Sequence, residues 1–167
     1  MGHEELQSNF NQLLLLCTCQ NPELRNWLDR KTSWTSHDVQ NEILQLMSQS
    51  VLREVLETIR KRDFFAILAD ETADISRKEL LSFSIRTVDD NLHAEEVALG
   101  LYSIDKCNAD YITKVILNIL ERFAIPLHSL HGQCYDGAAV MSGKLNGVAC
   151  RINSMEELST RIVKCTH

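Results

Sequence analysis

Apolar residues recur at helical spacing through the first third of the chain. This spacing predicts a helix over residues 4–18, a short helix opened by Pro22, and a long helix from His37 that Ser36 can cap. A break in the long helix is allowed near residues 48–50. We expect its apolar stripe to lie in the core: Val39, Ile43, Leu46, Met47, Val51, Leu52, Val55, Leu56 and Ile59. Residues 1–62 are therefore interpreted as a helical lead-in.

The hydrophobic spacing changes after residue 62. Residues 64–69 form a short continuous apolar run, which suits a strand buried on both faces. Residues 80–88 alternate between apolar and polar, and residues 97–104 form the next predicted strand. Asp89, Asp90 and Asn91 mark a turn between these two strands. Short connections of this kind predict three strands in an antiparallel meander.

The remainder of the chain alternates between helix and strand. Residues 108–123 form an amphipathic helix, residues 125–133 a strand, residues 136–152 a turn and helix, and residues 161–165 a fifth strand. Three strands, helix, strand, helix, strand is the order of the α/β RNase H-like fold, whose mixed sheet uses helical crossovers. We therefore expect residues 63–167 to be the N-terminal part of an RNase H-like catalytic domain, truncated at its fifth strand with an exposed sheet edge.

Composition narrows the partners of this chain. Its 167 residues include 17 basic and 23 acidic ones, for a net charge of −6, which argues against this segment binding DNA phosphates on its own. No signal peptide and no apolar run of membrane-spanning length is found, so we expect no membrane partner. The six cysteines are interpreted as reduced intracellular thiols, with Cys107, Cys134 and Cys150 as small core residues.

Two aspartates stand out as candidate chemistry. Asp70 ends the first predicted strand and Asp136 follows the fourth, and these strands are neighbours in an RNase H-like sheet. Two adjacent carboxylates repel each other, and Mg²⁺ resolves that repulsion because it prefers oxygen ligands. Residue types alone leave a plain alternative open, in which Asp70 belongs to a loop with a helix cap and Asp136 to a turn.

The segments around both aspartates resemble a known family. Residues 64–76 read FFAILADETADIS and residues 132–143 read GQCYDGAAVMSG. They are similar to the two signatures of hAT-type transposase relatives, which include the MYM-type zinc finger and THAP-domain transposase-derived proteins. The second signature typically reads G-x-x-Y-D-G-A-x-x-M-S-G. Residues 34–44 resemble the helical lead-in of the family, so the similarity covers nearly the whole chain.

This resemblance implies a function. Asp70 and Asp136 match the first two members of an Asp-Asp-Glu triad that binds Mg²⁺ or Mn²⁺ and catalyses DNA cleavage and strand transfer. The third member, a glutamate, lies far downstream in the family, and no residue here matches it. We therefore expect this fragment alone to be inactive.

The resemblance also implies partners and a location. The full-length parent would bind DNA in the nucleus and could form a homo-oligomer. A second interpretation stays open, in which the parent is a domesticated, non-enzymatic nuclear scaffold that keeps the fold for binding and regulation.

A nucleotide site is not expected in the second signature. Five residues separate Gly137 from Gly143, where a phosphate-binding P-loop has four. Leu145 stands where that motif needs Ser or Thr to bind Mg²⁺. The glycines are better explained by a tight strand-to-helix turn.

Overall fold

The chain forms two compact units, Met1–Val51 and Leu52–His167, in the computed structural model. The sequence-based division between residues 62 and 63 stays a prediction. The structure describes residues 8–30, 35–73, 75, 78–136, 138–143 and 145–155, and the backbone of residues 163–166.

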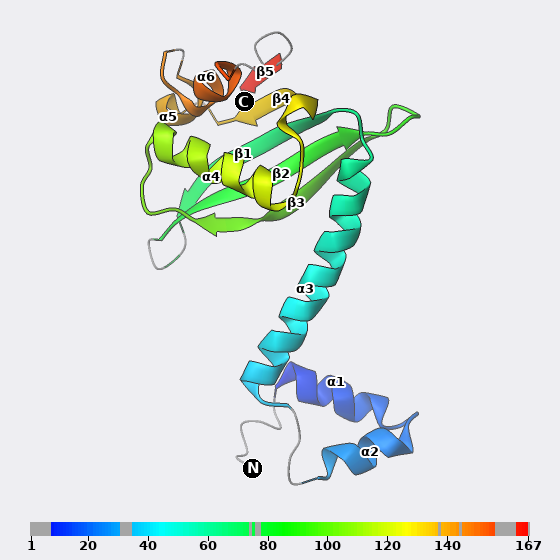
Figure 1. The fold of residues 1–167 in the computed structure, drawn as a ribbon. Helices are drawn as coiled ribbons and strands as arrows, with labels where there is room; N and C mark the ends of the chain where they lie inside the picture. Colours follow the sequence, from blue (N-terminus) through cyan, green and yellow to red (C-terminus); the bar gives the residue numbers. More distant parts are fainter. Residues whose placement is uncertain are drawn as a thin grey trace. The chain divides into compact units, whose positions relative to one another are not determined.

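The second and third helices begin where the sequence predicted, at Pro22 and after the Ser36 cap, whereas the predicted start of the first helix at residue 4 lies outside the described residues. α1 spans Asn9–Cys17, α2 spans Pro22–Leu28, and α3 runs without a break from His37 to Arg60 (Figure 1). The Ser36 hydroxyl accepts a hydrogen bond from the Val39 amide at 3.4 Å, which satisfies one of the free N–H groups at the start of α3. Local capping chemistry therefore sets where this helix begins.

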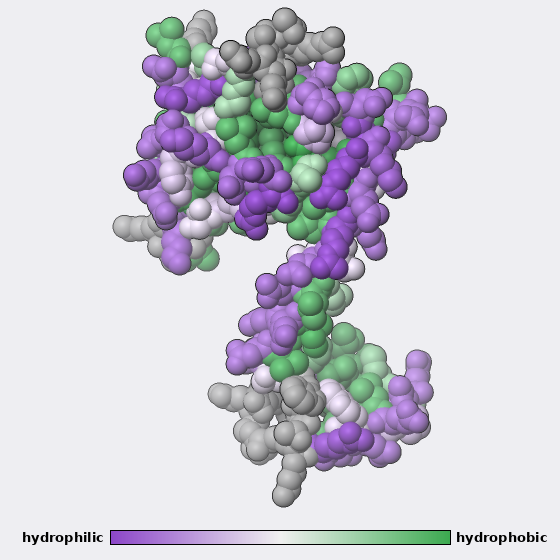
Figure 2. All heavy atoms as spheres, in the orientation of Figure 1, coloured by the Kyte–Doolittle hydropathy of each residue, from purple (hydrophilic) through white to green (hydrophobic). Residues whose placement is uncertain are grey.

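The core prediction for α3 is wrong over its N-terminal half. Ile43 is 39% exposed, and Leu46, Met47 and Val51 are 60–61% exposed. Apolar colour accordingly remains visible along this part of the helix (Figure 2). Only Leu56 and Ile59 are buried, because they belong to the larger unit and pack into its core. Helical spacing predicted an apolar face but not what covers it.

A five-stranded mixed sheet forms the centre of the larger unit, in the order β3-β2-β1-β4-β5. β1 pairs antiparallel with β2 and β2 with β3, whereas β1–β4 and β4–β5 are parallel. This order confirms the predicted RNase H-like α/β fold (Figure 1). The strands are β1 (Phe65–Ala73), β2 (Glu79–Val88), β3 (Ala94–Ser103), β4 (Leu130–Tyr135) and β5 (Val163–Thr166).

Helices cover one face of this sheet. α4 spans Ala109–Arg122 and buries Ile112 and Ile116 completely, and α5 (Ala139–Ser142) and α6 (Val148–Asn153) follow β4. On β1 and β2, buried residues alternate with half-buried or exposed ones, as expected where one face of a sheet packs on the core. The core-facing side chains of these strands are Phe65, Ile67, Ala69, Leu81, Phe83 and Ile85.

Several strand boundaries differ from their predictions. β3 begins at Ala94 rather than at residue 97, because its pairing with β2 extends to Val88 and Ala94. β4 begins at Leu130 rather than at residue 125, because the residues after Pro126 form the short 3-10 helix Leu127–Ser129. β1 continues to Ala73 rather than ending near residue 69, because its pairing with β2 extends to Ala73 and Glu79. Asp70 therefore lies within β1 and not at its end.

No helix in the part of the chain that the structure describes is long and apolar enough to cross a membrane.

Candidate functional site

The pairing of β1 with β4 brings the two predicted aspartates together. The last aligned pair of these parallel strands is Ala69 with Tyr135, so Asp70 is the next residue of β1 and Asp136 is the residue directly after β4. Neighbouring strands lie about 4.8 Å apart. The two carboxylates therefore start from adjacent backbone positions at the same end of this parallel pair.

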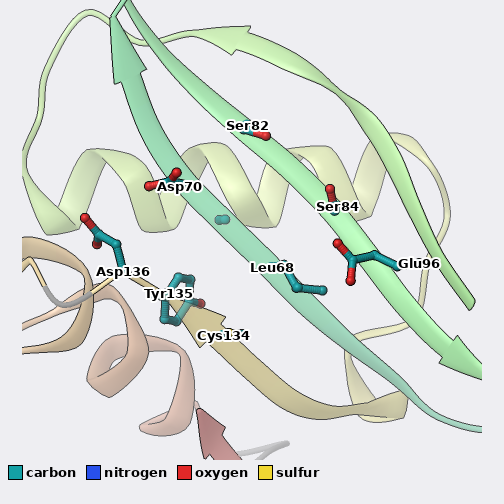
Figure 3. Close-up of a pocket in the computed structure, with 9 residues that line it drawn as sticks. Leu68, Asp70, Ser82, Ser84, Glu96, Cys134, Tyr135 and Asp136 are labelled. Carbon is teal, nitrogen blue, oxygen red and sulfur yellow. The ribbon is translucent and has the colours of Figure 1, made fainter. Parts of the chain in front are cut away.

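Both aspartates line one pocket of about 290 Å³. The pocket lies on the face of the sheet opposite α4, where Asp70, Ser82 and Ser84 point outward from β1 and β2 (Figure 3). Asp70 pairs across the sheet with Ser82. The complete lining is Leu68, Ala69, Asp70, Ser82, Ser84, Glu96, Cys134, Tyr135 and Asp136.

The charge of the pocket is negative. The described lining residues include no Lys, Arg or His, and neither Asp70 nor Asp136 forms a salt bridge within the described chain. Glu96 differs, because Arg86 pairs with its carboxylate at 2.7 Å. The unpaired negative charge is thus concentrated at the end of the pocket that holds the two aspartates.

The donor chemistry of this end suits a hard divalent cation. Carboxylate oxygens are the ligands that Mg²⁺ prefers, and it is often held by only one or two protein carboxylates. The described residues contain no group of three His, Cys, Asp or Glu side chains that could hold a metal ion. Asp70 and Asp136 therefore fit such an ion as a pair of ligands that would need completion by other oxygens.

Asp136 is oriented by a local turn. Its Oδ1 accepts a hydrogen bond from the Ala138 amide at 3.2 Å, an arrangement that aspartate side chains commonly make at the start of a turn. The plain alternative from the sequence, a turn at Asp136, is thus also present. The two interpretations are compatible because Oδ2 takes no part in this hydrogen bond.

Glu71 is a third carboxylate beside the pair, and sequence reasoning missed it. Burial raises the pKa of Glu71, and the negative charges of Asp136, Glu79 and Asp70 raise it further. A hydrogen bond with Cys107 opposes this increase. Glu71 Oε1 is buried without a hydrogen-bond partner among the described residues.

Other lining residues had weak sequence signals. Ser82 and Ser84 alternate with the buried residues of β2, which marks them as a polar face but assigns them no chemistry. Glu96 reaches the pocket from β3, and only the pairing of β2 with β3 places it there. The cysteine prediction needs correction, since Cys107 is exposed in a loop and Cys134 and Cys150 are half-buried.

A buried polar chain lies on the other face of β4. The Tyr135 hydroxyl donates to Gln133 Oε1 at 2.7 Å, and Gln133 Nε2 donates to Asn153 Oδ1 on α6 at 2.6 Å. Tyr135 and Gln133 are 3% and 2% exposed. Burial raises the pKa of Tyr135 so far that its hydroxyl stays a donor at any ordinary pH.

Comparisons with known proteins agree with the fold. Residues 2–147 match the family described as DUF4371, the ZMYM1/FAM200 RNase-like domain. The human 52 kDa repressor of the inhibitor of the protein kinase is 26% identical over 121 residues, which cover 72% of this chain. The matched region spans only 16% of that relative's length. The resemblance to MYM-type zinc finger relatives is thereby confirmed at the level of the family.

Proposed function

This chain belongs to the ZMYM1/FAM200, RNase-like domain family, and from that membership and the acidic pocket we propose that it is part of the catalytic domain of a hAT-like DNA transposase or of a protein derived from one. Asp70 and Asp136 are its two metal-binding catalytic carboxylates, and Mg²⁺ or Mn²⁺ is the cofactor. The full-length protein acts on DNA in the nucleus as a homo-oligomer.

The parallel alignment of Ala69 with Tyr135 carries this proposal. It delivers two carboxylates to one pocket whose described lining offers no positive side chain to neutralise them. Adjacent unpaired carboxylates favour a bound cation, because the ion replaces their repulsion with attraction.

Each side chain has a defined task in this proposal. A divalent ion held by Asp70 and Asp136 would supply Lewis-acid stabilisation of the charge that develops in phosphoryl transfer. Asp70 holds its carboxylate outward from the middle of β1, and the Ala138 amide holds Oδ1 of Asp136. A further carboxylate from elsewhere in the full-length protein completes the triad, so this chain alone is inactive.

Calorimetric titration of the chain with Mn²⁺ tests the site. We expect saturable binding whose affinity falls by about tenfold or more in Asp70→Ala or Asp136→Ala. Loss of a residue that only orients a metal ligand already lowers affinity by about this factor, and loss of the ligand itself should cost at least as much. Glu96→Gln is the matched control. It also removes one negative charge from the pocket lining, but that carboxylate is already paired with Arg86.

Two results would contradict the metal site. One is the absence of Mn²⁺ binding to the unmodified chain. The other is an equal loss of affinity in Glu96→Gln and Asp70→Ala, which would show a general response to negative charge rather than coordination.

A domesticated, non-enzymatic scaffold is the second candidate function. One observation favours it: the human relative is named as a repressor. In that case the fold is kept for binding and regulation, and the acidic pair is a remnant.

The full-length protein separates the two candidates. DNA nicking and strand transfer with Mn²⁺, abolished by Asp70→Asn, would support the enzyme. Two results together would support the scaffold. The unmodified full-length protein would show no DNA cleavage, and the Asp70→Asn, Asp136→Asn double variant would keep its regulatory activity.

A further inference from the structure

We propose that the buried chain Tyr135–Gln133–Asn153 is a positioning device for Asp136. It rests on the proposed function for its metal readout, but its effect on the Asp136 side chain can be measured without metal. Neither Gln133 nor Asn153 lines the acidic pocket, so both residues act through β4 and α6 rather than by touching a ligand.

The hydrogen bonds close a loop that begins at the aspartate. From Asp136 the chain passes through α5 and α6 to Asn153, whose Oδ1 accepts from Gln133 Nε2 at 2.6 Å. Gln133 in turn accepts from the Tyr135 hydroxyl at 2.7 Å. The side chain of Tyr135, one residue before Asp136, is therefore held by Gln133. The segment that follows Asp136 returns to β4 through the hydrogen bond between Asn153 and Gln133.

Burial makes this arrangement selective for one geometry. Gln133 and Tyr135 are almost completely buried, so a displaced hydrogen bond would leave polar groups without water to replace it. Side-chain networks of this kind act cooperatively and specify one arrangement. The backbone of Tyr135 is thus fixed one residue before the carboxylate that needs a defined position.

The Ala138 amide supplies a direct reporter. Its hydrogen bond to Asp136 Oδ1, 3.2 Å long, exists only while the carboxylate keeps its orientation. In metal-free protein, we expect Tyr135→Phe or Asn153→Ala to shift the NMR signal of this amide and to speed its hydrogen exchange by about tenfold. The same variants should weaken Mn²⁺ binding by about tenfold, at the low end for partners that orient metal ligands.

Thr113→Val is the matched control for lost stability. The Thr113 hydroxyl donates to the Ala109 carbonyl at 2.6 Å and is also buried, but it lies on α4 and lines no part of the pocket. We expect it to leave both the Ala138 amide and Mn²⁺ affinity unchanged. Because Tyr135→Phe and Asn153→Ala interrupt one chain, their effects on Mn²⁺ affinity should be non-additive in the double variant.

The outcomes distinguish this inference from the proposed function. If Asp70→Ala abolishes Mn²⁺ binding but neither Tyr135→Phe nor Asn153→Ala changes the Ala138 amide signal or the Mn²⁺ affinity, the positioning role is wrong and the metal site stands. If the unmodified chain binds no Mn²⁺ but Tyr135→Phe and Asn153→Ala both alter the NMR signal and hydrogen exchange of the Ala138 amide, the metal site is wrong and the positioning of Asp136 stands. Equal responses in Thr113→Val would overturn the positioning role by showing that the amide follows overall stability.

Discussion

At the scale of single residues, Ala124 has an unfavourable backbone conformation that a substitution can relieve. It follows α4 with φ of 50°, and the Ile125 amide donates to the Leu120 carbonyl across it at 2.9 Å. This left-handed position after a helix favours glycine, which has no Cβ to clash. Ala124→Gly should therefore raise the free energy of unfolding by about 1 kcal/mol in urea denaturation. Ala109→Gly, at the first residue of α4, should lower the free energy of unfolding, because glycine loses more backbone freedom than alanine in a helix. A change of the same sign at both positions would contradict this explanation.

Asp89 makes the stability of the β2–β3 turn dependent on pH. Hydrogen bonds lower its pKa from the ordinary value of 3.8, chiefly the one from the His93 amide. A lowered pKa means that the ionised form stabilises the fold above pH 3.8, and that this contribution is lost as the pH falls through the lower folded-state value. In Asp89→Asn the amide oxygen can accept the same hydrogen bonds without the charge. The melting temperature of the variant should be lower at pH 6 and should converge with that of the unmodified chain as the pH falls below the lowered folded-state pKa of Asp89. A gap that is constant with pH would refute the linkage.

At the scale of secondary-structure elements, hydrophobic spacing predicted the order of the sheet but not where each strand ends. The apolar run before Asp70 stops at Ala69, which is also where β1 stops pairing with β4. β1 nevertheless continues to Ala73, because β2 supplies backbone partners to residues that are not apolar. Backbone pairing leaves little trace in side-chain pattern, so the extension could not be predicted.

The α5–α6 segment depends on close backbone contact between glycines. A Cβ added to Gly143 would clash with the Ala139 carbonyl oxygen, and one added to Gly147 would lie 2.5 Å from the Gly143 nitrogen. Close approach rather than positive φ therefore explains why glycine stands at position 143, where φ is −53°. The predicted strand-to-helix turn also involved Gly137, which lies outside the described residues. Gly143→Ala should lower the free energy of unfolding by about 2 kcal/mol, measured in urea. Ser142→Ala, at the preceding half-buried position, removes only the hydrogen bond from the Ser142 hydroxyl to the Ala138 carbonyl and should change the free energy of unfolding by less than about 1 kcal/mol.

At the scale of the whole molecule, the candidate site divides into a part that sequence could predict and a part that it could not. Asp70 and Asp136 stand in local signatures, and the strand order alone predicted that their strands are neighbours. Glu96 enters the pocket from β3, and Asn153 joins Gln133 from α6. These contacts depend on register and on the path of the chain, which no local pattern of residues contains.

The two compact units should also unfold separately. In Met1–Val51 the only buried side chains among the described residues are the polar Asn11 and Thr35, whereas the larger unit has a continuous apolar core. Because burial of apolar surface is the main stabilising contribution, the first unit should unfold at lower urea concentration.

Both tryptophans of the chain, Trp27 and Trp34, lie in that unit, so their fluorescence reports it alone. Urea titration followed by tryptophan fluorescence should give a lower midpoint than circular dichroism in the β-sheet region, which follows the larger unit. Deletion of residues 1–51 should leave the circular dichroism transition in place. If the fluorescence and circular dichroism midpoints of the full chain coincide, and the deletion abolishes the circular dichroism transition, the two units fold as one.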